Sequence, residues 1–138
     1  MTPQEKPRWQ YRFEHFKRAY FLLQESIEQK QERGLNQLEK EGVIQRFEYA
    51  LELAWKTLKD YLEFQDVILT QITPRSTIKE AFSSKLISDP DDWMEALDAR
   101  NKMSHVYDFQ EFEIVIQQIE EKYLNCFAKL YEKLYEQI

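Results

Sequence analysis

The segment from Arg100 to Asp108 combines side chains that could act on a phosphodiester. Its sequence, Arg-Asn-Lys-Met-Ser-His-Val-Tyr-Asp, places a cation, an amide, an imidazole and a phenol within nine residues. Near neutral pH His105 could act as general base or acid, Arg100 could stabilise the phosphoryl charge, and Asn101 could orient the substrate. Such a set needs no metal if RNA supplies its own 2′-hydroxyl as nucleophile. The same Arg and His could instead simply interact with the dipole at a helix C-terminus.

Helical geometry constrains how these side chains meet. Asn101 and His105 are four residues apart and share a helix face. Arg100 and His105 are five residues apart, which separates them by about 140° at 3.6 residues per turn. The Arg100 side chain must therefore curl around the helix, or the site must be shared across a dimer.

Other reaction types find little support in the sequence. The two histidines, His15 and His105, lie in no HExxH or Cys/His ligand pattern, so we expect no metal site. With 2 Gly in 138 residues, the chain lacks a phosphate-binding loop, a dinucleotide fingerprint and a nucleophile elbow around Ser104. No cofactor is expected.

The composition indicates that helices must position these residues. Hydrophobic residues make up 43% of the chain, enough for a sizeable core, while 2 Gly and 4 Pro leave little material for the turns of an all-β fold. Apolar residues spaced three or four apart predict five helices. These run over residues 8–33, from about 36 towards 64, from Pro74 towards Leu86, from Pro90 into the 100–105 region, and from Asp108 almost to the end. We predict an all-α fold, an antiparallel (up-and-down) four-helix bundle with one additional short helix, as a single domain over residues 1–138.

Several further residues have more than one interpretation. The acids in Asp89-Pro90-Asp91-Asp92 are interpreted as helix-capping residues and not as metal ligands. Cys126 lies in an apolar helical stripe and is predicted to be buried. The three tryptophans, Trp9, Trp55 and Trp93, could fill the core or build a dimer face.

The motif Arg100-Asn101-x-x-x-His105-x-Tyr107 resembles the Arg-x4-His-x-Tyr motif of the HEPN superfamily. Two further blocks, over residues 46–59 (RFEYALELAWKTLK) and 73–82 (TPRSTIKEAF), are similar to nucleotidyltransferase substrate-binding proteins. The resemblance extends over most of the chain, from about Phe13 to Tyr123.

This resemblance implies a helical bundle that forms homodimers and is the partner of a minimal nucleotidyltransferase encoded nearby. In toxin–antitoxin pairs of this kind, the HEPN subunit is a metal-independent ribonuclease toxin, and the nucleotidyltransferase silences it by transferring AMP to the motif tyrosine. Carried over, Arg100 and His105 are the catalytic pair, Asn101 supports them, and Tyr107 is the adenylylation site. The alternative is a non-catalytic subunit that binds a substrate or nucleotide for the nucleotidyltransferase.

Charge and cysteine content bear on partners and location. The formal charge of -6 disfavours non-specific binding to duplex nucleic acid, so an RNA substrate would need local contacts. Arg46, Lys56 and Arg75 are candidate substrate-binding residues, although on helices of alternating charge such cations are more often solvated surface residues. One cysteine and no apolar run typical of a signal peptide or membrane span predict a cytoplasmic protein without membrane association.

Overall fold

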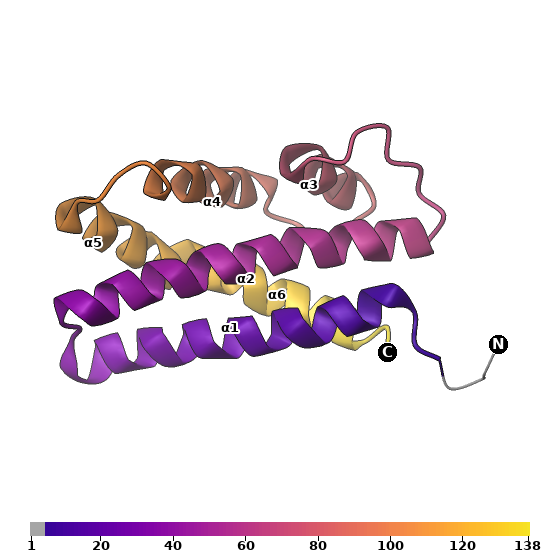
Figure 1. Cartoon of the computed structure of the whole chain (residues 1–138). Helices are drawn as coiled ribbons and strands as arrows, with labels where there is room; N and C mark the ends of the chain where they lie inside the picture. Colours follow the sequence, from indigo (N-terminus) through magenta and orange to yellow (C-terminus); the bar gives the residue numbers. More distant parts are fainter. Residues whose placement is uncertain (1–4) are drawn as a thin grey trace.

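The computed structural model describes residues 5–138 (Figure 1). Within that range the chain is helical and contains no strand. The helices are α1 (Arg8–Arg33), α2 (Gln37–Phe64), α3 (Pro74–Ser83), α4 (Pro90–Met103), α5 (Phe109–Gln118), η1 (Ile119–Tyr123) and α6 (Leu124–Tyr135). The predicted helices are confirmed, with limits within a few residues of those expected from the sequence.

The helices form the predicted antiparallel bundle (Figure 1). Helices α1 and α2 form a long hairpin, and the segment from α5 to α6 packs against both of them. The short helices α3 and α4 follow one another along α2 and together fill the fourth position of the bundle. The structure thus confirms a four-helix bundle with one additional short helix. No helix among residues 5–138 combines the length and the apolar composition that crossing a lipid bilayer requires.

Local sequence signals explain where the helices begin and end. Gly34 follows α1 with φ 76°, a conformation that glycine adopts without steric cost. Asn36 and Glu39 form a reciprocal capping box at the start of α2. Thr73 caps α3, and Pro74 occupies its first position. These caps satisfy backbone N–H groups that the helix itself leaves unpaired.

At two helix starts, an acidic side chain pairs with another helix and does not cap its own. Asp89 occupies the N-cap position of α4, but its side chain makes no cap hydrogen bond. Its carboxylate instead accepts a hydrogen bond from the Cys126 thiol, 3.1 Å away. At the start of α5, Asp108 accepts from the backbone N–H of Gln110, whereas Glu111 pairs with Lys102 and does not complete a capping box. Asp89 thus contacts α6, and Glu111 contacts α4.

The last predicted helix is interrupted by the π-helical turn η1. There the backbone N–H of Leu124 donates to the carbonyl of Ile119, five residues earlier. The turn carries Tyr123, whose ring stacks on Phe47 of α2 with centroids 5.5 Å apart. The apolar spacing alone predicted a regular helix through this point.

All three tryptophans are buried within the single chain. Trp9 and Trp93 are 1% and 0% exposed, and Trp55 is 9% exposed. Trp93 packs edge-on against Phe127 with ring centroids 5.6 Å apart. The idea that the tryptophans form a dimer face is therefore wrong, because the bundle buries them among its own helices.

The two ends of the described chain lie at the same end of the bundle (Figure 1). Trp9, in the first turn of α1, packs on Tyr61 of α2 with centroids 4.9 Å apart. The hydroxyl of Tyr61 donates to Gln137, close to the other terminus, at 3.3 Å. The loop between α4 and α5 lies at the opposite end of the bundle.

Candidate functional site

The motif residues lie on the last turn of α4 and in the loop that leads to α5 (Figure 1). The N–H of Ser104 still donates to the carbonyl of Arg100 at 3.2 Å, four residues back. The N–H of His105 donates to the carbonyl of Lys102, only three residues back, at 3.1 Å. The helix therefore tightens and ends at this point, and the residues after it are free to leave the helical path.

Arg100 is held against helix α2. One of its guanidinium nitrogens, Nη1, donates to Glu52 Oε2 at 2.8 Å, and the Arg100 side chain is 20% exposed. The other terminal nitrogen, Nη2, lies 3.4 Å from the amide oxygen of Asn101. Arg100 thus contacts both its sequence neighbour Asn101 and Glu52 of α2, and the contact with Glu52 was not expected from the sequence.

Glu52 is ionised at neutral pH. Burial raises the pKa of its carboxyl, but hydrogen bonds from Trp55 and Lys56, together with the charges of Lys56 and Arg100, hold that pKa below its usual range. One turn earlier on α2, burial raises the pKa of Glu48, although the charge of Arg100 opposes the shift. Arg100 therefore lies close to carboxylates of α2 that differ in their ease of ionisation.

His105 and Tyr107 are exposed in the loop. Within residues 5–138, no hydrogen bond or ion pair joins the His105 imidazole to Arg100. Tyr107 is 77% exposed, and its ring makes edge-on contacts with Phe109 and Phe112, with centroids 6.0 and 5.6 Å apart. Since Phe112 is buried, these contacts hold one side of the Tyr107 ring against the bundle, while most of the residue is exposed.

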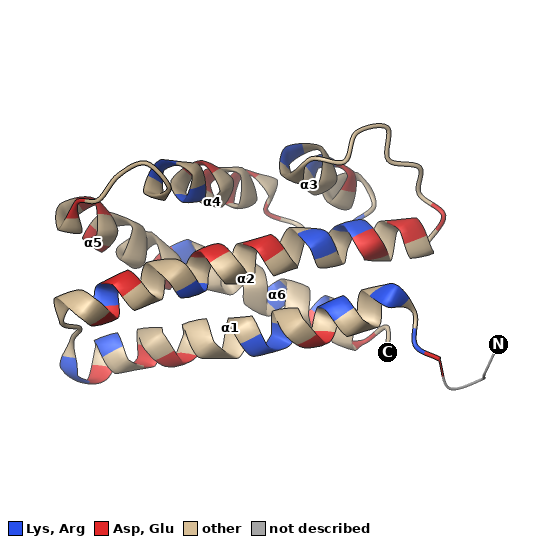
Figure 2. Cartoon of the chain, viewed as in Figure 1, with Lys and Arg blue, Asp and Glu red and all other residues tan. Residues whose placement is uncertain are grey.

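The three candidate substrate-binding cations lie in different surroundings. Lys56 joins the group around Arg100, because its ammonium pairs with Glu52 at 3.0 Å. Arg46 points to α1, where it donates to the carbonyl of Leu22 and the hydroxyl of Ser26, both at 2.8 Å. Arg75 pairs with Asp98 of α4 at 2.7 Å. In Figure 2, basic and acidic residues are interspersed along α1 and α2.

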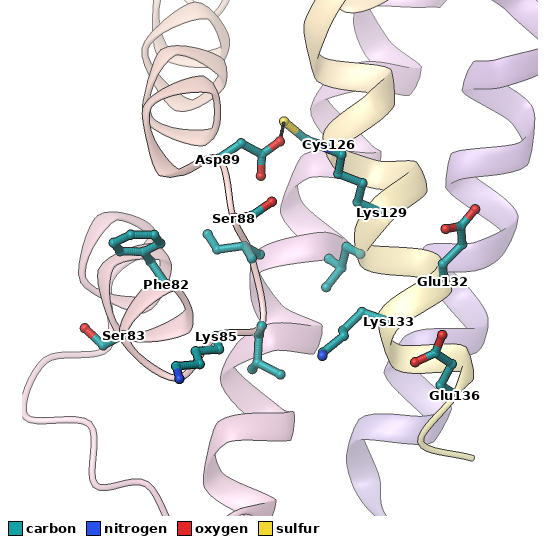
Figure 3. Close-up of a pocket in the computed structure, with 13 residues that line it drawn as sticks. Phe82, Ser83, Lys85, Ser88, Asp89, Cys126, Lys129, Glu132, Lys133 and Glu136 are labelled. Atoms are coloured by element: carbon teal, nitrogen blue, oxygen red, sulfur yellow. Dashed lines mark hydrogen bonds between the residues drawn. The ribbon is translucent and has the colours of Figure 1, made fainter.

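A cavity of about 820 Å³ lies between the α3–α4 connection and α6, near the start of α4 (Figure 3). Asp89 and Cys126, which line the cavity, bring one potential ligand atom each within 4.8 Å of one another and of a carboxylate oxygen of Asp92. The hydrogen bond from the Cys126 thiol to Asp89 accounts for the proximity of these two residues. The motif lies at the other end of α4, so the cavity and the motif are separate features.

We expect the Cys126 thiol to resist alkylation in the folded protein. Burial and the hydrogen bond to Asp89 raise the pKa of the thiol, so little of the reactive thiolate forms at pH 8. Treatment with iodoacetamide, followed by mass spectrometry, should modify the native protein at least tenfold more slowly than the urea-unfolded protein. Equal rates in the two states would contradict the buried position of Cys126.

Comparison with known proteins assigns the chain to a family. Residues 11–136 match the family model described as "Nucleotidyltransferase substrate binding protein like". The chain belongs to this family. The match covers most of the chain, including the motif and both blocks that carry the sequence resemblance. The family assignment made from the sequence is therefore confirmed.

Individual proteins to which the chain is similar agree with this assignment. A Haemophilus influenzae protein named "Probable ribonuclease HepT" is 36% identical over 84 residues, which cover 58% of this chain and 57% of that protein. A solved H. influenzae structure, described as the fold of a substrate binding domain of a nucleotidyltransferase, is 28% identical with a TM-score of 0.78. That match covers 89% of this chain and 98% of the other.

A solved structure from Thermus thermophilus shares the fold. It is 23% identical with a TM-score of 0.70, and the match covers 88% of this chain and 97% of the other.

Proposed function

We propose that this family member is the HEPN subunit of a toxin–antitoxin pair, a metal-independent ribonuclease silenced by adenylylation of Tyr107. The observation that carries the proposal is a fixed arginine beside a loop with an exposed imidazole and phenol. Arg100 is held by Glu52 at the end of α4, and His105 and Tyr107 follow within seven residues of it. The name of the H. influenzae relative, a ribonuclease, supports the same activity.

The residues suggest a transfer within the RNA backbone. The His105 imidazole takes the proton of a 2′-hydroxyl, and the 2′-oxygen attacks the adjacent phosphorus. Arg100 stabilises the charge on the non-bridging oxygens, and the bond from phosphorus to the 5′-oxygen breaks. The leaving oxygen takes a proton from water or from the imidazolium of a second subunit. The products are a 2′,3′-cyclic phosphate and a 5′-hydroxyl, and no metal ion is needed to balance the step.

A dimer would bring Arg100 and His105 together, although they lie apart within one subunit. Arg100 faces α2, whereas His105 is exposed in the loop, so no hydrogen bond joins the two side chains within one subunit. A homodimer that brings two such loops together would supply Arg100 from one subunit and His105 from the other. Adenylylation would then add bulk and negative charge at Tyr107, where the cleft must admit an RNA phosphate.

The test is cleavage of total cellular RNA by the purified protein in EDTA. A second sample is first treated with the neighbouring nucleotidyltransferase and ATP, and Tyr107→Phe is treated in the same way. We expect cleavage by the untreated protein, loss of cleavage after treatment, and retained cleavage by Tyr107→Phe. Absence of cleavage by the untreated protein would contradict the ribonuclease proposal.

A second candidate is a non-catalytic subunit that presents a substrate or nucleotide to the nucleotidyltransferase. The description of the family and of the H. influenzae structure as substrate binding favours it. In that case no sample cleaves RNA, while Arg100→Ala weakens binding of the nucleotidyltransferase or of ATP in isothermal titration calorimetry. The two candidates therefore give opposite results in the cleavage assay.

A further inference from the structure

We infer that Glu52 of α2 is a positioning residue, which fixes the orientation of the Arg100 guanidinium for an RNA phosphate. The inference rests on the proposed ribonuclease function and adds a residue outside the Arg-x4-His-x-Tyr motif. Glu52 lies 48 residues before Arg100 and meets it only because α4 packs along α2.

The Glu52 carboxylate is itself held in place. Its Oε2 accepts from Arg100 Nη1 at 2.8 Å and from Trp55 Nε1 at 3.0 Å, and its Oε1 pairs with Lys56 Nζ at 3.0 Å. Trp55 is buried in the core, so its indole N–H is a fixed donor. Because three donors share one carboxylate, rotation of the Glu52 side chain would break several contacts at once. Arg100 is therefore attached to a rigid part of the bundle.

This arrangement leaves part of the guanidinium available to a ligand. A guanidinium carries five N–H donors. Among residues 5–138, hydrogen bonds from the Arg100 guanidinium reach Glu52 and Asn101, which leaves the remaining donors for a phosphate. An arginine already fixed in direction loses less conformational entropy when it binds, and a planar donor group needs a defined direction to form paired hydrogen bonds.

The nearby cation Lys102 is held less firmly than Arg100. Lys102, two residues after Arg100, has a side chain 54% exposed and pairs with Glu111 across the α4–α5 loop. An exposed pair of this kind adds little stability and fixes its partners weakly. Glu111→Gln is therefore a matched control for Glu52→Gln, because each removes one carboxylate charge from a cation at the same end of α4.

The activity test compares Glu52→Ala, Glu52→Gln and Glu111→Gln in single-turnover RNA cleavage. We expect Glu52→Ala to lower the cleavage rate at saturating enzyme on the order of 10- to 100-fold, with the half-saturating enzyme concentration nearly unchanged, since misdirection of Arg100 acts on the reacting phosphate. Glu52→Gln, which keeps an acceptor for Arg100, should retain more activity, and Glu111→Gln should match the wild type. Unchanged or faster cleavage by folded Glu52→Ala would overturn the inference.

A second measurement does not depend on cleavage. Nitrogen-15 NMR of the arginine side chains, with Arg100→Lys to assign the signal, reports how ordered the Arg100 guanidinium is. We expect slow proton exchange and restricted motion in the wild type and in Glu111→Gln, and faster exchange and motion in Glu52→Ala. If the wild type cleaves no RNA, the proposed function fails while this result still decides whether Glu52 orients Arg100. Equal mobility of Arg100 with and without Glu52 would refute the positioning role.

Discussion

Replacing His105 with alanine should lower RNA cleavage on the order of 100- to 10,000-fold, because the proposed reaction loses its general base. The fold should be unaffected, since His105 is exposed in the α4–α5 loop and its hydrogen bond to Lys102 is made by the backbone N–H, which alanine keeps. The melting temperature of the variant should therefore equal that of the wild type. Cleavage is followed on a labelled RNA in EDTA, and unfolding by circular dichroism.

His15 supplies the matched control for this experiment. It is the other histidine of the chain, lies on α1 and is also exposed. His15→Ala removes the same side chain from a position outside the motif and should cleave RNA at the wild-type rate. If His105→Ala retained full cleavage, the catalytic assignment of His105 would be refuted. If both variants lost activity equally, the loss would not be specific to the motif.

Replacing Trp93 with alanine should destabilise the protein by about 3–5 kcal/mol, the usual cost of removing a large buried aromatic side chain. Trp93 is fully buried and packs on Phe127 of α6, so the substitution leaves a cavity between α4 and α6. Single domains are stable by only about 5–15 kcal/mol, so this loss is a large part of the total. Urea denaturation followed by circular dichroism measures it.

Trp93→Phe is the control for this substitution. The indole nitrogen of Trp93 is buried and has no hydrogen-bond partner among the described residues, so phenylalanine removes an unsatisfied donor while it keeps an aromatic ring in the core. We expect Trp93→Phe to cost clearly less than Trp93→Ala. A cost for Trp93→Ala below about 1 kcal/mol would show that the residue is not part of the packed core.

Helix positions could be predicted because their signals are local. Asn36 with Glu39, and Thr73 with Pro74, mark helix starts within four residues of sequence, and the structure has both. The motif could also be located, since its members lie within one short segment. Its assignment to a helix end and loop follows from the break between the fourth and fifth predicted helices.

The contacts that shape the site could not be predicted, because helix packing brings distant residues together. Glu52 is one of 25 acidic residues, and nothing in its local sequence links it to Arg100. Likewise the hydrogen bond from the Cys126 thiol to Asp89 joins residues 37 positions apart. Because the Asp89 carboxylate accepts this hydrogen bond, it does not cap α4 as predicted. The apolar spacing also gives no sign of the π-helical turn at Ile119–Tyr123. An α-helical turn and a π-helical turn bury the same types of residue, so the sequence does not distinguish them.

The arrangement of the chain ends has a practical consequence. Trp9, near the first described residue, and Gln137, near the last, both contact Tyr61 at the opposite end of the bundle from the α4–α5 loop (Figure 1). An affinity tag, a fluorophore or a tether to a sensor surface could therefore be fused at either end without covering Arg100 or Tyr107. A protein immobilised in this way would present the loop to the solution, so RNA and nucleotidyltransferase could be passed over the same surface in turn.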